Sequence, residues 1–252
     1  MKELKKAGYQ KTKRSGPTGI GKTLESLLDL KENNIQGPDF ETYELKSKRR
    51  ASNSMVTFVT RTPQPEGSIN EMKEAYGYPW DGTPDEPVVS DDETLSKWVG
   101  LPEPESSRDP RIGKLVLHQT VSAVKPNALG FILRRSKGVW TVVNDKKIPC
   151  YYEDEYVFEA LRDKYPDRLI VVEADHRGTN EEEEFWYNGS IKIYHNFRFD
   201  TFHELVAKGI ILVDLRLGLY PNGKPHDHGT GFRAFPRNID QCFEKVEVVR
   251  EA

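Results

Sequence analysis

Hydrophobic positions along this chain follow two spacings, one typical of helices and the other of strands. The helical spacing predicts helices over 24–31, 155–165 and 201–208, the first capped by Thr23, and short helices over 70–75 and 238–243. Apolar runs and alternation predict strands over 42–47, 54–62, 114–121, 131–135, 139–143, 168–174, 185–194, 210–219 and 246–249. The strands at 42–47 and 54–62 are expected to pair as one hairpin, and those at 131–135 and 139–143 as another.

A long polar segment interrupts this pattern between residues 63 and 110. It is rich in Pro, Gly and acidic residues, so we expect an insertion there, most acidic over 78–111. A chain of 252 residues can form one domain with a substantial core, in two lobes. No apolar run could span a membrane and no signal peptide is recognisable, which predicts a cytoplasmic protein. In that reducing compartment, Cys150 and Cys242 are expected to be buried free thiols.

The formal net charge of −3 hides an uneven distribution. Residues 1–22 contain seven Lys and Arg against one acid, Glu3, whereas residues 66–109 contain twelve acids against three bases. A basic N-terminal surface can attract nucleic acid even though the whole chain is slightly acidic. Both charge runs could equally be solvated faces of the protein.

Two chemical signatures overlap between residues 14 and 46. Residues 16–23, GPTGIGKT, satisfy the Walker A pattern of nucleotide-binding loops, and 210–214 imitates a Walker B strand. A Walker loop follows a buried strand, and the polar stretch 9–15 does not predict one, so a P-loop NTPase is the weaker interpretation. The glycines and Lys22 could instead approach a DNA phosphate at the start of the following helix.

The second signature is an Asp followed by Glu-x-Lys, which is typical of metal-dependent nucleases. Glu44 and Lys46 are two residues apart on one strand, so their side chains share a face, where a carboxylate can bind Mg2+ and an ammonium can contact phosphate. Asp39 lies at an odd offset from Glu44 and needs a turn or bulge to join them, and Glu25 on the preceding helix is a further candidate. Exposed strands also alternate Glu and Lys for purely structural reasons.

A polar region near the C-terminus has the composition expected of a DNA-reading surface. Arginine binds guanine in the major groove, and an acid accepts a hydrogen bond from cytosine. Within twenty residues the chain offers Asp214, Arg216, His226, Asp227, His228 and Arg233. His226 and His228 could alternatively bind a transition metal, but the neighbouring arginines favour nucleic acid.

Together these blocks resemble the MvaI/BcnI-type restriction endonucleases, which are distantly similar to the mismatch-repair nickase MutH. The matching blocks are GIGKTLE at 19–25, PDF at 38–40, ELK at 44–46, LHQTVS at 117–122, VDLRLG at 213–218 and HDHGTGFR at 226–233. The family contains the Gly-rich block without depending on a nucleotide, which disfavours the Walker interpretation. The resemblance implies a mixed α/β restriction-endonuclease-like PD-(D/E)xK fold, with a catalytic lobe and a recognition lobe that clamp DNA.

The resemblance also implies roles for individual residues. Residues 1–125 would carry the catalytic motifs, with Asp39, Glu44 and Leu45 binding metal, Lys46 as the catalytic lysine and Glu25 as an auxiliary acid. Residues 200–252 would carry the recognition motifs, and the implied DNA contacts are Lys22, His118, Asp214, Arg216, His226, Asp227, His228 and Arg233. The acidic segment at 78–111 is longer than the family norm.

The implied activity is that of a type II restriction endonuclease from a prokaryotic cytoplasm. Such a monomer would use Mg2+ to cut double-stranded DNA at a CC-N-GG-like site, one strand at a time, beside a cognate DNA methyltransferase that protects the host. The alternatives left open are a MutH-like nicking enzyme, a P-loop NTPase and a DNA-binding module with an inactive site.

Overall fold

The computed structural model describes most of the chain and divides it into two compact units. The described residues are 2–14, 16, 18–30, 43–50, 52–82, 109–165 and 168–249. Unit 1 consists of Met1–Asn53, Leu161–Phe199 and Arg237–Ala252, and unit 2 of Ser54–Ala160 and Asp200–Pro236. Neither unit is continuous in sequence, so each one is completed by segments from distant parts of the chain.

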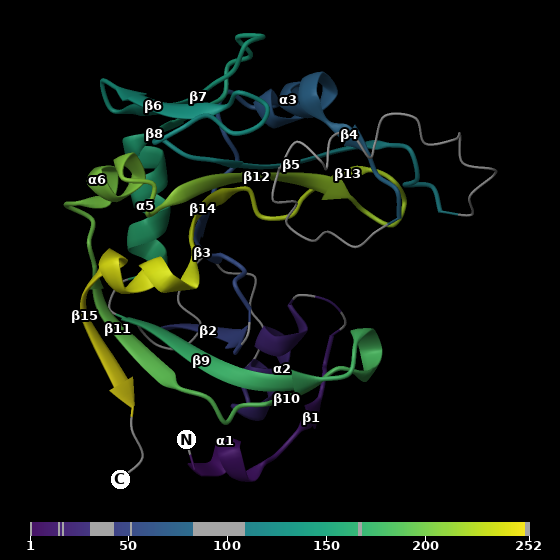
Figure 1. Cartoon of the computed structure of the whole chain (residues 1–252), viewed down its shortest axis with the longest axis vertical. Coiled ribbons are helices and arrows are strands. Elements are labelled where there is room, and N and C mark those ends of the chain that lie inside the picture. Colours follow the sequence, from purple (N-terminus) through teal and green to yellow (C-terminus); the bar gives the residue numbers. More distant parts are fainter. Residues whose placement is uncertain are drawn as a thin grey trace. The chain divides into compact units, whose positions relative to one another are not determined.

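Unit 1 is built on a mixed six-stranded sheet (Figure 1). Its strands are β1 (Gln10–Lys11), β2 (Tyr43–Arg49), β9 (Arg168–Arg177), β10 (Glu184–Trp186), β11 (Ile191–Phe197) and β15 (Phe243–Val249). Its helices are α1 (Lys2–Lys6), α2 (Gly19–Leu27), the 3-10 helix η1 (Asn180–Glu182) and most of the 3-10 helix η2 (Pro236–Cys242). Strand β9 is central, because β2 pairs with it in parallel while β10 and β11 pair with it antiparallel. The edge strands β1 and β15 pair antiparallel with β10 and β11. This mixed sheet with helices confirms the predicted fold class.

Helix α2 packs on the unit 1 sheet through its apolar side. Ile20 and Leu24 are buried in one cluster with residues of β9, β10 and β11, and Leu45 of β2 packs against that cluster. The prediction that Thr23 caps this helix is wrong, because the helix begins at Gly19 and Thr23 lies inside it. The buried Thr23 hydroxyl donates to the Gly19 carbonyl at 2.8 Å and accepts from the Lys13 amide at 3.0 Å.

The glycines of the Walker-like block have a packing role in α2. A Cβ on Gly19 would overlap the carbonyl oxygen of Arg14, and a Cβ on Gly21 would lie 3.9 Å from the Ser47 hydroxyl of β2. Close approach of the chain therefore requires glycine at 19, and a small residue at 21 suits the contact with β2. The strand before the block is β1, a two-residue edge strand that is not buried. It therefore does not supply the buried strand that precedes a nucleotide-binding Walker loop.

In its described residues, unit 2 contains two sheets and three helical segments. The larger, six-stranded sheet contains β3 (Val56–Thr60), β4 (Tyr78–Pro79), β5 (Leu115–Val121), β12 (Leu212–Leu219), β13 (Pro225–Asp227) and β14 (Gly231–Ala234). The smaller sheet contains β6 (Ile132–Ser136), β7 (Val139–Val143) and β8 (Tyr151–Glu153). The helices are α3 (Ser68–Tyr76), α6 (Phe202–Ala207) and the first part of α5 (Asp154–Lys164), whose last turn belongs to unit 1. Strand β12 organises the larger sheet, because β5, β13 and β14 all pair with it antiparallel.

The observed strands overturn one predicted hairpin and divide one predicted strand. Strand β2 pairs with β9, and β3 pairs with β14, so the predicted hairpin of 42–47 with 54–62 is wrong. The predicted strand at 185–194 is two strands, β10 and β11, separated at Gly189, where a Cβ would overlap Glu173. The segment 221–233, whose Gly, Pro and Asn content favours a loop, contains β13 and most of β14. The pairings of β2 with β9 and of β3 with β14 join distant parts of the sequence, which local patterns do not specify, whereas β10 and β13 pair with the nearby strands β9 and β12.

Several predictions that depend on local sequence are confirmed. The hairpin of β6 and β7, the short helix α3 and the helix α5 lie where the apolar pattern placed them. Cys150 and Cys242 are free and buried, and burial raises the pKa of each thiol to about 12. None of the described helices combines the length and apolar character needed to span a bilayer. Most of the predicted acidic insertion, 83–108, lies outside the described residues.

Candidate active site and nucleic-acid interface

Strand β2 places Glu44 and Lys46 together on one face of the unit 1 sheet. Leu45 points to the other face and packs against the apolar cluster under α2. Because side chains alternate along a strand, Glu44 and Lys46 point away from that cluster. The Lys46 ammonium lies 2.7 Å from Glu44 Oε1. The next lysine on this face, Lys48, pairs instead with Glu173 of β9 at 2.7 Å. Lys46 is therefore the lysine of β2 that accompanies the candidate catalytic carboxylate.

Glu44 is a buried carboxylate with one oxygen saturated and one left over. Only 2% of the residue is exposed. Oε1 accepts from Lys46 and also lies 3.2 Å from the ammonium of Lys164, whereas Oε2 is buried and has no hydrogen-bond partner among the described residues. A buried polar atom without a partner is destabilising unless another group satisfies it. A hard divalent cation, which prefers carboxylate oxygens, fits this atom.

The structure describes the positions of Leu45 and Glu25, but not that of Asp39, among the remaining catalytic candidates. Asp39 lies in 31–42, outside the described residues. Leu45 has an apolar side chain in the core, so it can offer a cation only its main-chain carbonyl. Glu25 lies on α2 and pairs with Lys22 at 3.4 Å, and the structure shows no contact of Glu25 with Glu44 or Lys46. Among the described residues, no group of three His, Cys, Asp or Glu side chains is arranged to bind a metal. Of the carboxylates proposed to bind the metal, Glu44 is the one that lies within the described residues.

The sequence reasoning did not single out Lys164, the last residue of α5. Strand β9 begins at Arg168, only four residues later, and Arg168 is the register partner of Tyr43, next to Glu44. The parallel pairing of β2 with β9 thus brings the end of α5 beside the carboxylate. This pairing joins segments that are more than one hundred residues apart, and no local pattern reveals it.

The larger sheet of unit 2 gathers most of the predicted DNA-reading residues on one face. Asp214 and Arg216 alternate on β12, opposite Thr120 and His118 of β5 in the strand register. Arg233 comes from β14, on the other side of β12. Side chains directly opposite each other on antiparallel strands share a face, so three strands contribute to one polar surface.

Asp214 lies at the centre of this surface, with Oδ1 hydrogen-bonded and Oδ2 in ion-pair contact with two arginines. Its Oδ1 accepts from the Thr120 hydroxyl at 2.9 Å, and its Oδ2 lies 3.3 Å from Arg233 Nε and 3.8 Å from Arg216 Nε. Arg233 also donates to the Gly229 carbonyl at 2.6 Å. Burial lowers the pKa of Arg233 to about 10, although Asp214 opposes the shift, so the guanidinium remains charged at neutral pH. Asp214 therefore holds two arginines in place.

Asp227 stabilises the turn that precedes β14. Its Oδ1 accepts from the amides of Gly229 and Thr230 at 2.8 and 2.6 Å, and its Oδ2 accepts from the Thr62 hydroxyl at 3.1 Å. Both oxygens are thus used within the protein in this structure. The base-reading role predicted for Asp227 would require it to release one of these contacts.

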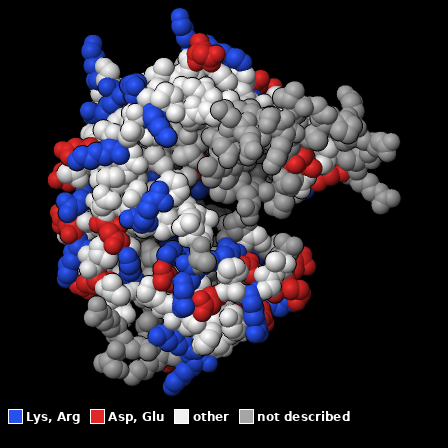
Figure 2. All heavy atoms as spheres, viewed as in Figure 1, with Lys and Arg blue, Asp and Glu red and all other residues white. Residues whose placement is uncertain are grey.

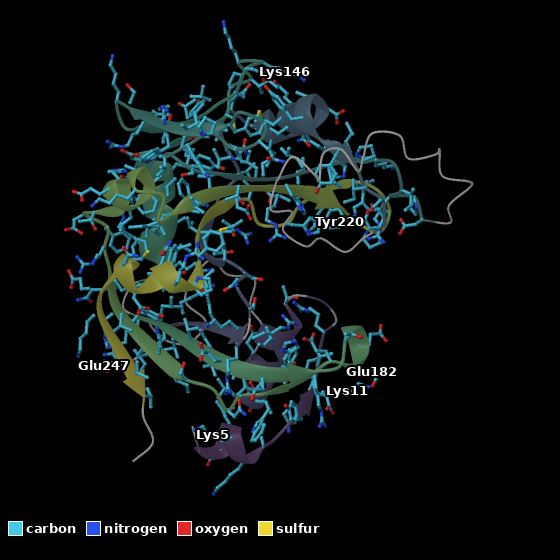
Figure 3. The ribbon with its side chains drawn as sticks, viewed as in Figure 1. Lys5, Lys11, Lys146, Glu182, Tyr220 and Glu247 are labelled. Carbon is cyan, nitrogen blue, oxygen red and sulfur yellow. The ribbon has the colours of Figure 1, made fainter. Side chains whose placement is uncertain are left out.

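Four aromatic and histidine rings extend the polar surface beyond Arg216. Tyr220 stacks on His226 with 4.1 Å between ring centroids, His226 meets His228 at 4.6 Å, and His228 lies 6.4 Å from His118. Tyr220, labelled in Figure 3, is the exposed end of this row, and the buried His118 is the other end. The structure thus brings His118, His226 and His228 together beside Arg216, as expected of one surface.

Charge on the visible surface is mixed. On the face shown in Figure 2, the basic side chains of the described residues are interspersed with acidic ones. At the basic N-terminal segment, for example, Lys11 is paired with Glu182 at 2.9 Å (Figure 3). Part of the excess of lysines at 1–22 is therefore neutralised by acids from distant sequence.

Comparison with known proteins identifies the family. The family model described as the MvaI/BcnI restriction endonuclease family matches residues 1–243. A solved structure of restriction endonuclease MvaI in complex with cognate DNA substrate is similar, with a TM-score of 0.76, 27% identity, and coverage of 98% of this chain and 94% of that chain. A structure of MvaI in the absence of DNA has the same identity and coverage and a TM-score of 0.49. No curated protein matches. This chain belongs to the MvaI/BcnI restriction endonuclease family and is a site-specific deoxyribonuclease.

Proposed function

We propose that this type II restriction endonuclease hydrolyses double-stranded DNA with Mg2+ at a centre formed by Glu44, Lys46 and Asp39. The observation that carries the proposal is the buried Glu44 Oε2, which has no partner among the described residues and lies in the same carboxylate that Lys46 contacts. A carboxylate with one oxygen held by lysine and the other available is suited to bind a cation. The similar MvaI structure is a complex with a cognate DNA substrate, which supports duplex DNA as the substrate here.

Each residue of the centre has a defined task in hydrolysis. Glu44, together with Asp39 and the main-chain carbonyl of Leu45, would hold the cation. When bound, Mg2+ lowers the pKa of the attacking water and offsets the negative charge that develops on the phosphate. Lys46 donates from its ammonium to the attacked phosphate or to the water, and so stabilises charge that appears only during the reaction. Glu25 and Lys22 form an ion pair on α2 and would act as an auxiliary acid and a backbone contact.

Recognition is assigned to unit 2. Arg216, held by Asp214, is proposed to bind guanine through two hydrogen bonds. Arg233 is proposed to bind a second guanine, for which its buried guanidinium would have to release the Gly229 carbonyl. Two arginines fit a target with two guanines, as in the CC-N-GG-like site that the family resemblance suggests. The rings of His118, His226 and His228 lie next to Arg216 and are proposed to contact the neighbouring bases or backbone.

We further propose that the enzyme acts as a monomer. A single catalytic centre cuts one strand at each visit, so the second strand requires the enzyme to rebind. A cognate DNA methyltransferase would protect the host genome. A nicking enzyme of the MutH type remains the second candidate, since it needs the same centre but cuts only one strand.

Sequencing the ends of digested plasmid DNA tests this proposal. Digestion with Mg2+ should yield cuts in both strands at one short sequence, with nicked circles appearing before linear DNA, and EDTA should stop the reaction. Cuts confined to one strand would favour the nicking enzyme. Cleavage that persists in EDTA, or cuts at no fixed sequence, would contradict the proposal.

A further inference from the structure

A second lysine contacts the candidate catalytic carboxylate. The Lys164 ammonium lies 3.2 Å from Glu44 Oε1, the oxygen that also accepts from Lys46 at 2.7 Å. Lys46 and Lys164 come from different elements, β2 and α5, and converge on the same atom. The second oxygen of Glu44 remains without a partner among the described residues.

The last turn of α5 holds Lys164 firmly beside Glu44. Leu161 and Tyr165, on either side of it, are buried in unit 1. The Tyr165 ring stacks on Phe197 with 5.6 Å between centroids and meets Phe243 edge-on at 6.2 Å. Apolar packing therefore fixes the end of the helix, and this places the Lys164 ammonium beside the Glu44 carboxylate.

The two lysines are placed for different tasks. In the proposed reaction Lys46 shares its three ammonium donors between Glu44 Oε1 and the phosphate or the attacking water, so any reorientation of the ammonium toward the substrate weakens its 2.7 Å contact with Oε1. A buried carboxylate oxygen that loses its partner is destabilised. Lys164 is placed to keep Oε1 bonded when Lys46 moves, and so to leave Oε2 available for the cation.

We propose that Lys164 is a positioning residue of the nuclease centre, which holds Glu44 Oε1 so that Lys46 can transfer its ammonium to the substrate. The inference rests on the proposed roles of Glu44 and Lys46. The inference also predicts how metal binding changes when Lys164 is removed. Lys164 is a positive charge beside the cation site, so its removal should leave divalent-cation binding unchanged or tighter, because like charges repel. Cleavage should nevertheless slow. Without Lys164, Lys46 is the one remaining partner of Glu44 Oε1 among the described residues, and its ammonium is then less available to the substrate.

The test uses the full-length enzyme with Lys164→Met. We expect single-turnover cleavage at saturating Mg2+ to fall about 10- to 100-fold, as is typical when a residue that orients a metal ligand is lost. Binding of Mn2+ without DNA, followed by the electron paramagnetic resonance signal of the free ion, should show an unchanged or lower dissociation constant. Lys164→Arg, which keeps the charge, should recover most of the rate.

Lys192→Met is the matched control. Lys192 is also in unit 1, its side chain is 33% exposed like that of Lys164, and it lies 3.1 Å from Asp240. Because Asp240 belongs to no candidate centre, the control should cleave and bind Mn2+ like the wild type. If Lys164→Met does not fold, Lys164→Gln takes its place in the same two measurements.

Two results would overturn the inference. The first is wild-type cleavage by the Lys164 variant. The second is a rate loss accompanied by an equal weakening of Mn2+ binding, which would mean that Lys164 merely supports the shape of the site. Glu44→Ala and Lys46→Ala separate this failure from that of the proposed function. If those two variants still cleave, the catalytic assignment itself is wrong.

Discussion

Each unit contains a buried carboxylate flanked by two cations, and the two sites differ in one oxygen. In unit 1, Glu44 Oε1 contacts Lys46 and Lys164, while Oε2 has no partner among the described residues. In unit 2, Asp214 Oδ2 contacts Arg216 and Arg233, and Oδ1 accepts from Thr120. In unit 1 one oxygen of the carboxylate thus has no partner among the described residues, whereas in unit 2 both oxygens contact a protein group.

The difference indicates two kinds of task. A carboxylate with an unsatisfied oxygen can gain a cation, which suits chemistry on a phosphodiester. A saturated carboxylate fixes the direction of its partners, which suits arginines that must meet base edges in a defined geometry. Lysines accompany the first carboxylate and arginines the second, in keeping with the point charge of an ammonium and the planar fork of a guanidinium.

The largest expected effect on stability comes from removing Asp214. Asp214→Ala leaves Arg233, whose side chain is 9% exposed, buried without its counter-charge. Breaking a buried pair in this way costs about 3–5 kcal/mol of unfolding free energy. Glu44→Ala should cost less, because the side chains of Lys46 and Lys164 are 22% and 33% exposed and can turn to water.

Urea unfolding of both variants measures this contrast. Thr120→Val serves as an intermediate variant, since it removes only the hydroxyl bonded to Asp214 and should cost about 1 kcal/mol. Equal losses for Asp214→Ala and Glu44→Ala would mean that the two carboxylates are equivalent in the fold, and the comparison would fail.

Removing Arg216 should weaken recognition. If Arg216 binds one guanine through two hydrogen bonds, Arg216→Ala lowers specific binding by about 1–3 kcal/mol and leaves non-specific binding nearly unchanged. Arg134→Ala is a suitable control in the same unit, because this exposed arginine of β6 donates only to the carbonyls of Ala123 and Leu133 among the described residues. Gel-shift titrations in Ca2+ on cognate and altered sites give the specificity ratio. An unchanged ratio for Arg216→Ala would remove it from the reading surface.

The smallest expected effect concerns pH and the charge pairs of unit 2. Burial lowers the pKa of His203, with Arg135 acting in the same direction and Asp154 against it. Trp140 Nε1 donates to His203 Nδ1 at 3.2 Å, a bond that a proton on Nδ1 would break. The unfolded chain therefore binds a proton more readily, and stability should decline as the pH falls below the ordinary histidine value of about 6.5.

Comparing urea unfolding at pH 7 and pH 5.5 for the wild type and His203→Gln isolates this contribution. The variant should lose less stability on acidification, whereas His176→Gln, at an exposed position, should behave like the wild type. The same pH dependence in all three proteins would show that His203 does not contribute.

The sequence predicted several features that depend on neighbouring residues, although not the start of α2 or the short strand β13. Alternation on β2 placed Glu44 and Lys46 on one face, and the apolar run 210–219 predicted the strand β12 that carries Asp214 and Arg216. Helix α5 and the hairpin of β6 and β7 also follow from local apolar patterns.

Features that depend on distant partners were missed. An apolar strand such as β3 can satisfy its hydrogen bonds with any suitable edge, so its pairing with β14 was not visible. Lys164 reaches Glu44 only because β9 runs parallel to β2. The saturation of Asp214 and Asp227 likewise requires hydroxyls and amides from other strands and turns. Residue types indicated which side chains belong to the candidate DNA-reading surface. The hydrogen-bond partners of each side chain, which come from distant sequence, determine whether it is available to a ligand.

The central claim is that cutting and reading are separate tasks of the two units, and Lys46→Ala tests it most directly. Lys48→Ala is the control, because Lys48 lies on the same face of β2, is 23% exposed against 22% for Lys46, and pairs with Glu173 instead. We expect Lys46→Ala to lower cleavage in Mg2+ by about 100-fold or more. Specific binding in Ca2+ should stay within about threefold of the wild type, because one charge among many phosphate contacts adds little affinity. Retained cleavage by Lys46→Ala, or loss of its specific binding together with cleavage, would contradict this division of tasks.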